Sequence, residues 1–381
     1  MTGKERLHAA MDGKTTDLTA VMPKMWVDVA ARVMGISMAE AMGDPARSTA
    51  VIVDAARKLG ADGARLLLFP RREFEPDGRG GLLHTDGQGS TAGTVDMSGG
   101  WKTCLAGRGF FDLENPGHMA HYHCYQSSVP LISGMDDAKR FTVPTACYYE
   151  DTGCGDIVSA ALANAGDSLA CVGDCNSGTL PLLAALRGMT EAMLDLVDNR
   201  ALAHAIMEKG VEMALERARF FVARGVHILR YNDSVANMSV ISPRCFREFV
   251  LPRIRDFCAG AHALSPDVKV YCHICGNVLP VLPDLAASGL DCIAPLDPLG
   301  GFTLAQARAA AGSSVVLMGG VNTLSFIRST PEEIMAEAQE CIRRGSEGGG
   351  YLLGSGCALP PDTKLENLAA VIQAAHGQDI R

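Results

Sequence analysis

The second half of the chain repeats one pattern, in which a short apolar run is followed by an amphipathic stretch. Five such units succeed one another from about residue 220, and their apolar runs are 225–233, 267–277, 290–297, 314–323 and 349–361. Strands that are apolar throughout and separated by helices are typical of a parallel sheet covered by helices. The sequence therefore predicts an α/β protein.

Two kinds of parallel sheet satisfy this pattern, an open doubly wound sheet and a closed barrel. No G-x-G-x-x-G follows an early strand, and polar residues recur at the C-terminal end of nearly every strand, as in "RYND", "CHICGN" and "GGVNT". In a barrel all these ends meet at one mouth. We expect a (β/α)8 TIM barrel that forms a single domain over residues 1–381.

The first half of the chain is less regular. Residues 44–70 read as a helix and a strand, whereas residues 71–155 are rich in glycine and polar residues. We interpret 71–155 as an insertion of hairpins or loops that shapes a substrate lid. Its closely spaced His118, His121 and His123 are either a second metal site or ordinary polar loop histidines.

Composition excludes several classes of function. The 34 Lys and Arg against 43 Asp and Glu give a net charge of −9, and no basic cluster is interleaved with aromatic residues, so we expect no nucleic-acid partner. No apolar run reaches 18 residues and the N-terminus lacks a cleavage site, so we expect no membrane partner and a cytoplasmic protein. Its 13 cysteines are then expected to be reduced.

The segment "VYCHICGN" places Cys272, His273 and Cys275 in a run that otherwise reads as a buried strand. Side chains alternate along a strand, so His273 and Cys275 share one face while Cys272 points the other way. A redox pair of Cys272 and Cys275 is disfavoured, because such pairs work at a helix N-terminus where the turn brings the thiols together.

Two ligands do not make a metal site, and a third candidate is Cys357 in "GSGCALPP", at the mouth-facing end of the last strand. One imidazole and two thiols suit Zn²⁺ and leave its fourth position open, as in catalytic zinc sites. The alternative is that all three residues are packed core, because free cysteine is among the most buried residue types.

Polar residues at other strand ends are further candidates. Asp233 is a candidate catalytic residue that acts as a general acid or base, orients His273, or caps the helix that begins near Ser242. The candidate substrate-binding residues are Asn232, Asn277, Asp297 and Asn322. Their predicted position at the mouth is the argument for them.

Most of residues 220–377 resembles the uroporphyrinogen decarboxylase superfamily, in particular its branch of zinc-dependent, corrinoid-linked methyltransferases that includes the methylcobamide:coenzyme M methyltransferases. The matching segments are "SPRCFREFVLPRI", "HICGN", "GGVNTLSFIRSTPEEI" and "PPDTKLEN". The resemblance implies a (β/α)8 barrel and a zinc ion bound by H-x-C plus a distant cysteine. His273, Cys275 and Cys357 match that pattern.

The resemblance also implies a reaction, the movement of a methyl group between a small methylated or thiol substrate and the cobamide of a corrinoid protein. No D-x-H-x-x-G cobalamin signature occurs, so we expect the corrinoid on a separate partner protein. The long insertion favours demethylation of a compound such as a methoxylated aromatic. The sequence is compatible with a homodimer.

Two alternatives come from the same resemblance. Uroporphyrinogen decarboxylases hold the substrate carboxylates with an arginine-rich segment, but here the corresponding stretches read "VMPKMWVDVA" and "LLLFPRREFE". Without those arginines the carboxylates have no evident counter-charges, so decarboxylation is disfavoured. The other alternative is a barrel that binds a corrinoid protein or a ligand without catalysis.

Overall fold

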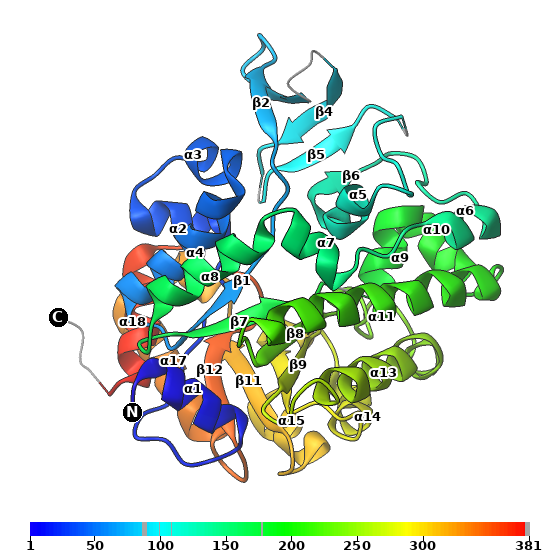
Figure 1. Cartoon of the computed structure of the whole chain (residues 1–381). Helices are drawn as coiled ribbons and strands as arrows, with labels where there is room; N and C mark the ends of the chain where they lie inside the picture. The colour runs from blue at the N-terminus through cyan, green and yellow to red at the C-terminus, as the bar shows by residue number, and fades with distance from the viewer. Residues whose placement is uncertain (86–89, 99, 108, 177, 378–381) are drawn as a thin grey trace.

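The computed structural model describes residues 1–85, 90–98, 100–107, 109–176 and 178–377. Its centre is a seven-stranded sheet in which every neighbouring pair is parallel (Figure 1). In sheet order the strands are β1 (Gly63–Leu66), β7 (Ala170–Asp174), β8 (Ile228–Asn232), β9 (Lys269–His273), β10 (Cys292–Leu296), β11 (Val316–Val321) and β12 (Tyr351–Ser355). Each of the five runs predicted after residue 220 contains one of the strands β8 to β12.

Helices follow the strands and cover the sheet. The longer ones are α4 (Pro45–Leu59), α8 (Cys154–Ala165), α11 (Arg200–Ala223), α13 (Leu251–His262), α17 (Pro331–Gly345) and α18 (Leu365–Ala375). The shorter ones are α1 (Gly3–Met11), α2 (Val27–Met34), α3 (Met38–Gly43), α9 (Leu180–Arg187), α10 (Met189–Asp195), α12 (Pro243–Cys245), α14 (Leu282–Ala286), α15 (Leu304–Ala311) and α16 (Ser325–Arg328). No described helix is both long and apolar enough to cross a lipid bilayer.

The helix starts follow from local sequence. Thr330 and Glu333 form a reciprocal capping box at the start of α17, as their spacing predicts. Ser242 caps α12 through the backbone N–H of Cys245, and Pro243 occupies the first helical position. A π-helical turn, Phe246–Val250, then joins α12 to α13.

The two faces of the sheet pack differently. One face carries Val172, Ile228, Tyr271 and Val316, which form a small buried cluster with the N-terminal helix α1. The other face carries Leu229 and Cys272 among others, and it joins the larger core shared with the surrounding helices. This division is the side-chain alternation expected of buried strands.

Both outer strands of the sheet lie beside the same N-terminal segment. The backbone N–H of Met22 donates to Leu353 O at 3.0 Å, and that of Leu353 donates to Ala20 O at 2.9 Å. On the other side, the N–H of Asp62, just before β1, donates to Val21 O at 2.9 Å. Residues 20–22 therefore link β12 to the residue just before β1. This link requires the sheet to curl strongly.

The predicted insertion contains a second, five-stranded sheet that projects above the parallel sheet (Figure 1). Its strands, in order, are β2 (Glu73–Pro76), β3 (Leu82–Thr85), β4 (Thr91–Asp96), β5 (Lys102–Leu105) and β6 (Tyr125–Gln126). The pairs from β2 to β5 are antiparallel hairpins, and β6 pairs parallel to β5. The helices α5 (Pro116–Ala120), α6 (Met135–Arg140) and α7 (Ala146–Asp151) follow. Buried residues such as Trp101 and Phe111 join the insertion to the main core.

Candidate metal centre

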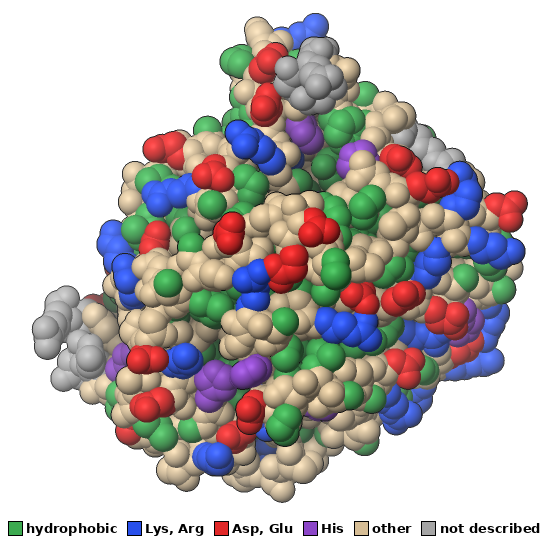
Figure 2. All heavy atoms as spheres, viewed as in Figure 1, with side chains coloured by type: hydrophobic (Ala, Val, Ile, Leu, Met, Phe, Trp, Pro, Cys, Tyr) green, Lys and Arg blue, Asp and Glu red, His purple; other side chains and the backbone are tan. Residues whose placement is uncertain are grey.

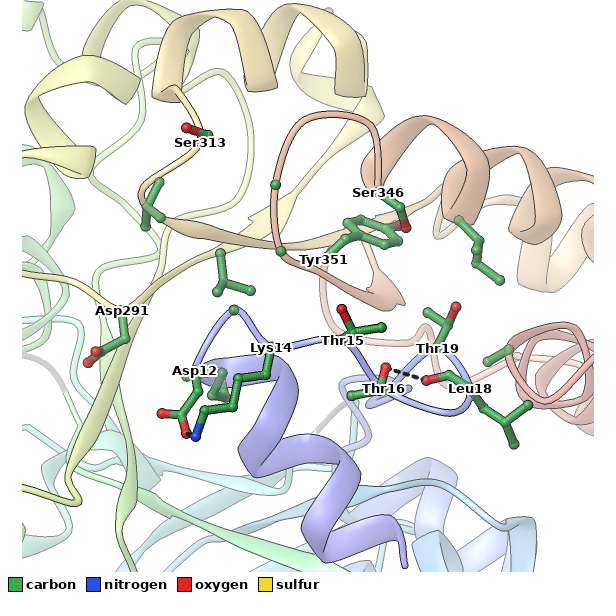
Figure 3. Close-up of a pocket in the computed structure, with 18 of the residues that line it drawn as sticks. Asp12, Lys14, Thr15, Thr16, Leu18, Thr19, Asp291, Ser313, Ser346 and Tyr351 are labelled. Carbon is green, nitrogen blue, oxygen red and sulfur yellow. Dashed lines mark hydrogen bonds and ion pairs between the residues drawn. The ribbon is translucent and has the colours of Figure 1, made fainter. Parts of the chain in front are cut away.

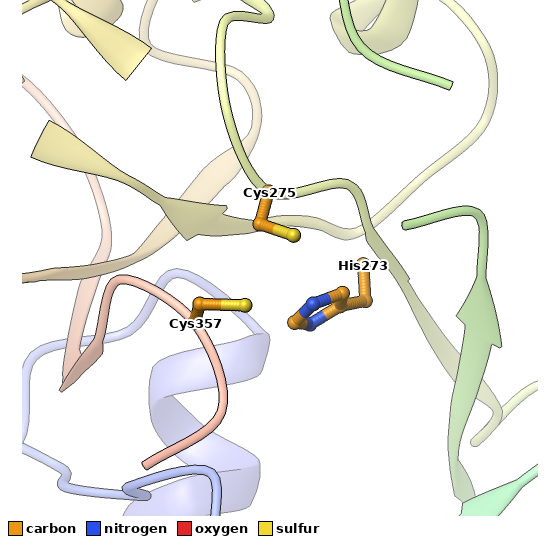
Figure 4. A group of neighbouring side chains, drawn as sticks. All are labelled: His273, Cys275 and Cys357. Carbon is orange, nitrogen blue, oxygen red and sulfur yellow. The ribbon is translucent and has the colours of Figure 1, made fainter. Parts of the chain in front are cut away.

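The structure brings the three predicted metal ligands together (Figure 4). His273 is the last residue of β9, Cys275 follows it by two residues, and Cys357 lies two residues beyond β12. Their ligand atoms all lie within 4.8 Å of one another. Since β10 and β11 separate β9 from β12 in the sheet, only its curl allows this approach. His273 is buried, and both cysteines are half-buried.

The neighbouring Cys272 lies on the opposite face of β9, as strand alternation predicts. Its side chain is buried in the helix-facing core close to Cys258 of α13, and burial raises the pKa of its thiol well above the ordinary value. All 13 cysteines are free in the structure. A redox pair of Cys272 and Cys275 has no support in this geometry.

The two half-buried thiols are coupled. The interaction between the two thiols raises the pKa of Cys275 and lowers that of Cys357. The Cys275 thiol also donates to the backbone oxygen of Ser234, with Sγ and O 3.9 Å apart. A lowered pKa favours the thiolate of Cys357, and thiolates are the form of cysteine that binds metals.

Lys24 is a site residue that the sequence interpretation missed. Its Nζ lies 2.7 Å from His273 Nε2, although 249 positions separate the two residues. Burial, followed by the charges of Arg230 and Arg65, lowers the pKa of Lys24 well below its ordinary value. Lys24 lies in "VMPKMWVDVA", the stretch that replaces the arginine-rich segment of the decarboxylases.

Behind Lys24, two buried arginines share one carboxylate. Arg230 Nη1 lies 2.6 Å from Asp174 Oδ2, and Arg65 Nη1 lies 3.5 Å from the same oxygen. Arg230 Nε has no hydrogen-bond partner. Two positive groups from β1 and β8 are therefore present near the metal centre, but both arginines are buried and paired with Asp174. A charged residue inside an apolar strand, as in "GARLLLF" and "HILRYND", was the signal that could have revealed them.

Asp233 is placed against a helix rather than against the metal ligands. Its carboxylate accepts hydrogen bonds from the Thr179 hydroxyl and from the backbone of Leu180 at the start of α9. Its own backbone N–H donates to His273 O at 2.9 Å. Burial raises the pKa of the carboxyl to about 7. The contacts support a capping role, though at α9 rather than near Ser242.

The four predicted substrate-binding residues lie at strand ends and make local contacts. Asn232 Oδ1 accepts a hydrogen bond from Arg230 at 2.6 Å, and Asn322 Oδ1 accepts one from the N–H of Leu324 at 2.9 Å. The other two serve neighbouring turns: Asn277 Oδ1 accepts from Leu279, and the Asp297 carboxylate accepts from Gly276 and Leu299. Their role in binding substrate stays a prediction.

The three insertion histidines occupy separate environments. His118 Nδ1 accepts a hydrogen bond from the Asp112 N–H at 2.9 Å, while His123 Nδ1 lies 3.3 Å from the Asn176 amide. His121 is buried, and its Nδ1 has no partner. Within the described ranges, the only cluster of three or more potential metal ligands is that of His273, Cys275 and Cys357. The geometry does not support a second metal site.

A large cavity lies at the other end of the sheet (Figure 3). It has a volume of about 920 Å³ and is bordered by the N-terminal ends of β9, β11 and β12. Its charged side chains pair with one another: Lys269 Nζ lies 2.9 Å from Asp12 and 3.6 Å from Asp291, and Lys14 lies 2.8 Å from Asp12. We call this cavity the N-terminal groove. In parallel barrels the functional residues gather at the opposite end.

The metal centre has the donor chemistry of a zinc site. An imidazole and two thiols are ligands that Zn²⁺ prefers, and three protein ligands leave one position for a substrate. The two sulfurs and their partial exposure fit this role better than a purely structural role, since a structural zinc takes a fourth protein ligand. The geometry defines a candidate metal centre at the C-terminal ends of the strands.

Comparison with known proteins places the chain in a family. The family "Uroporphyrinogen decarboxylase (URO-D)" matches residues 135–378. Since this match covers more than half of the chain, the protein belongs to that family. A solved methyltransferase from Methanosarcina mazei aligns over 99% of both chains with a TM-score of 0.69 and 20% identity, which shows that the fold is shared.

Within the family, curated relatives of two kinds are similar to the chain. A methylated-thiol–coenzyme M methyltransferase of Methanosarcina mazei is 30% identical over 173 residues, covering 45% of this chain and 44% of that protein. A methylcobamide:CoM methyltransferase of Methanosarcina barkeri is 26% identical over 206 residues, covering 51% and 58%. A uroporphyrinogen decarboxylase of Pelodictyon phaeoclathratiforme is 28% identical over 179 residues, covering 45% and 48%. The chain thus spans about half the length of these curated relatives.

Proposed function

We propose that the protein is a zinc-dependent methyltransferase that moves a methyl group between a small methylated or thiol substrate and the cobamide of a separate corrinoid protein. The observation that carries the proposal is the convergence of His273, Cys275 and Cys357 within 4.8 Å at the C-terminal ends of β9 and β12. Two of the relatives are coenzyme M methyltransferases, which supports the same class of reaction.

The three ligands determine what kind of metal chemistry the site supports. When bound, zinc supplies a mild Lewis acid that lowers the pKa of a thiol or polarises an ether oxygen. Two thiolates and one neutral imidazole would balance the charge of Zn²⁺, so the ion and its three ligands together would carry no net charge. The surrounding residues then decide which substrate is held there.

Arg65 and Arg230 make the space beside the ligands positive, since they share the one carboxylate of Asp174, and the Lys24 amine lies beside His273. An imidazole that binds a metal through one nitrogen carries a proton on the other, so it no longer accepts a hydrogen bond from Lys24. We propose that Lys24 then turns to an anionic substituent of the substrate. A substrate with both a thiol or ether and an acidic group fits this arrangement.

The remaining elements complete the proposal. Residues 20–22, which bond to β12 on one side and to Asp62 on the other, take the eighth position of a closed (β/α)8 barrel. We place the insertion over part of the mouth, and its length favours a larger methylated compound such as a methoxyaromatic over a small thiol. The corrinoid protein docks over the same mouth.

Decarboxylation of uroporphyrinogen is the second candidate. It is favoured by the decarboxylases among the relatives and by the buried positive groups beside the metal centre. Decarboxylation, however, does not require three soft metal ligands at one site. A barrel that binds without catalysis is a third candidate and likewise does not require all three ligands.

Reconstitution tests the proposal. Zinc-loaded protein is mixed with a corrinoid protein whose cobalt has been reduced and with a methoxyaromatic or methylated thiol, and methylation is followed by the change in cobalt absorbance. We expect methyl transfer only when the corrinoid protein is present, and none with the His273→Ala variant. Methyl transfer without cobalamin, or decarboxylation of uroporphyrinogen by the unaltered protein, would contradict the proposal.

A further inference from the structure

A second cavity lies apart from the metal centre, where the insertion meets the helices α4, α7 and α8. Its volume is about 660 Å³, which is within the range of small-molecule sites. None of the three metal ligands borders it. In Figure 2, histidine and hydrophobic side chains gather beneath the projecting hairpins. We call it the aromatic cavity, after its lining residues Phe69, Phe110, Tyr125, Tyr148, His118 and His121.

The rings of the aromatic cavity form a connected wall. The centroid of Phe110 lies 5.0 Å from that of His118, 6.0 Å from that of Tyr125 and 5.6 Å from that of His84. Phe110 and His118 are only half-buried, so part of their ring surface faces the cavity. Aromatic rings pack favourably against other rings, edge to face or offset. The wall therefore suits a planar aromatic ligand.

Two buried polar atoms on the cavity wall have no hydrogen-bond partner. They are His121 Nδ1 and Thr85 Oγ1, and their residues are 4% and 5% exposed. Buried polar groups in native proteins are nearly always hydrogen-bonded, so each unpaired one requires an explanation. Because both residues line the cavity, they are the candidate hydrogen-bond partners of a bound ligand.

The charge state of His121 indicates which group the ligand carries. Burial lowers the pKa of His121 well below its ordinary value, so the imidazole is neutral, with one N–H and one lone pair. The imidazole already hydrogen-bonds to the Leu68 backbone, which leaves Nδ1 as an acceptor. A hydroxyl group donates to such a nitrogen and also pairs with the Thr85 hydroxyl. In the lining, the carboxylates Asp44 and Glu73 outnumber the one cation, Arg71, which disfavours an acidic ligand.

We propose that the aromatic cavity is a binding site for a small phenol, with its ring against Phe110 and Tyr125 and its hydroxyl group at His121 and Thr85. The inference does not depend on the proposed methyl transfer. The inference is nevertheless related to the proposed methyl transfer, because a methoxyaromatic that loses its methyl group becomes a phenol. The cavity thus suits the product of one of the reactions proposed above.

Fluorine NMR of the full-length protein tests the inference with three probes. They are 4-fluorophenol, fluorobenzene, which lacks the hydroxyl group, and 4-fluorobenzoate, which carries a negative charge. We expect 4-fluorophenol to bind at least about tenfold more tightly than either of the others, since it alone offers a neutral hydroxyl group. Equal binding of 4-fluorophenol and fluorobenzene, or tighter binding of 4-fluorobenzoate, would overturn the inference.

Variants locate the binding. Cys357→Ala removes a metal ligand and should leave 4-fluorophenol binding unchanged; loss of binding there would place the phenol at the metal centre and overturn the inference. His121→Phe keeps a ring but removes the polar atom, and it should weaken binding at least about fivefold. Phe110→Ala, at a half-buried position with less risk to folding, should weaken binding similarly. His8→Phe on α1 is the matched control and should have no effect.

A result in which both His121→Phe and Phe110→Ala bind 4-fluorophenol as tightly as the unaltered protein would exclude the aromatic cavity. The outcome is independent of methyl transfer. Binding that persists in Cys357→Ala while methyl transfer fails in every reconstitution would support this site and reject the proposed function. Methyl transfer without 4-fluorophenol binding at the aromatic cavity would support the proposed function and reject this site.

Discussion

The two ends of the parallel sheet carry charged residues in different ways. At the N-terminal groove, Lys14 and Lys269 each lie within 3 Å of Asp12, so the charges are balanced among themselves. At the C-terminal end, Lys24 contacts a neutral imidazole and two arginines share one carboxylate. The N-terminal groove is a large cavity, whereas the pocket beside His273 is small. Unbalanced buried charge therefore identifies the functional end better than cavity volume does.

The largest effect is expected when a metal ligand at the C-terminal end of the sheet is removed. His273→Ala or Cys357→Ala should reduce zinc from about one ion per chain to almost none, because two ligands bind zinc poorly. Metal analysis of purified protein measures the effect, and X-ray absorption of the unaltered protein should show two sulfur ligands.

The matched control for this prediction is Cys272→Ala, one residue from His273. The Cys272 side chain faces the helices, so this variant should lose some stability but keep its zinc. Loss of the metal in Cys272→Ala, with full occupancy in Cys357→Ala, would show that the site has been assigned to the wrong face of β9.

A second test concerns Asp233, whose carboxyl has a pKa of about 7 in the folded protein against about 3.9 in an unfolded chain. Between these values the folded protein holds a proton that the unfolded chain has lost, so this group makes stability fall as pH rises. Asp233→Asn should remove that fall, which amounts to about 4 kcal/mol above pH 7. Urea unfolding at pH 4.5, 6 and 8 measures it, and parallel pH profiles for the two proteins would contradict the raised pKa of Asp233.

A third test sharpens the comparison at Lys24. Replacement by methionine should weaken binding of 3-mercaptopropionate to the zinc-loaded protein by about 10-fold or more, because a hydrogen bond to the substrate carboxylate is lost. Binding of the isosteric neutral 3-mercaptopropionamide should change little, and Lys24→Arg should retain most of the preference. Calorimetry gives both affinities. Equal affinity for the two thiols in the unaltered protein would show that the positive groups do not select the substrate.

The smallest effect is expected at the N-terminal groove. Lys269→Met breaks contacts with Asp12 and Asp291, but all three side chains are partly exposed, so the loss of stability should stay below about 1 kcal/mol. Methyl transfer should be unchanged. A large loss of activity in this variant would mean that the two ends of the sheet are functionally linked.

Much of the fold was predictable because it depends on periodicity. Continuous apolar runs identified β8 to β12, and strand alternation placed His273 and Cys275 on one side of β9 and Cys272 on the other. The antiparallel sheet of the insertion was described only as hairpins or loops, since its short strands are broken by glycines and half-exposed residues.

The parts that were missed depend on contacts between distant segments. Lys24 reaches His273 because residues 20–22 pair with β12, and no local pattern in "VMPKMWVDVA" predicts that pairing. The role of Asp233 at α9 depends in the same way on Thr179, which lies 54 positions earlier. Arg65 and Arg230 were recoverable, because a charged residue in a buried strand requires a buried partner.

The contact between Lys24 and His273 also bears on how the protein assembles. Contacts between residues far apart in sequence form late and slowly, because the intervening chain must first be ordered. The metal centre draws on the N-terminal segment, β9 and β12, so it exists only when the whole sheet has formed. Zinc uptake is then a measure of complete folding, and by mass action the bound ion would hold the ends of β9 and β12 together.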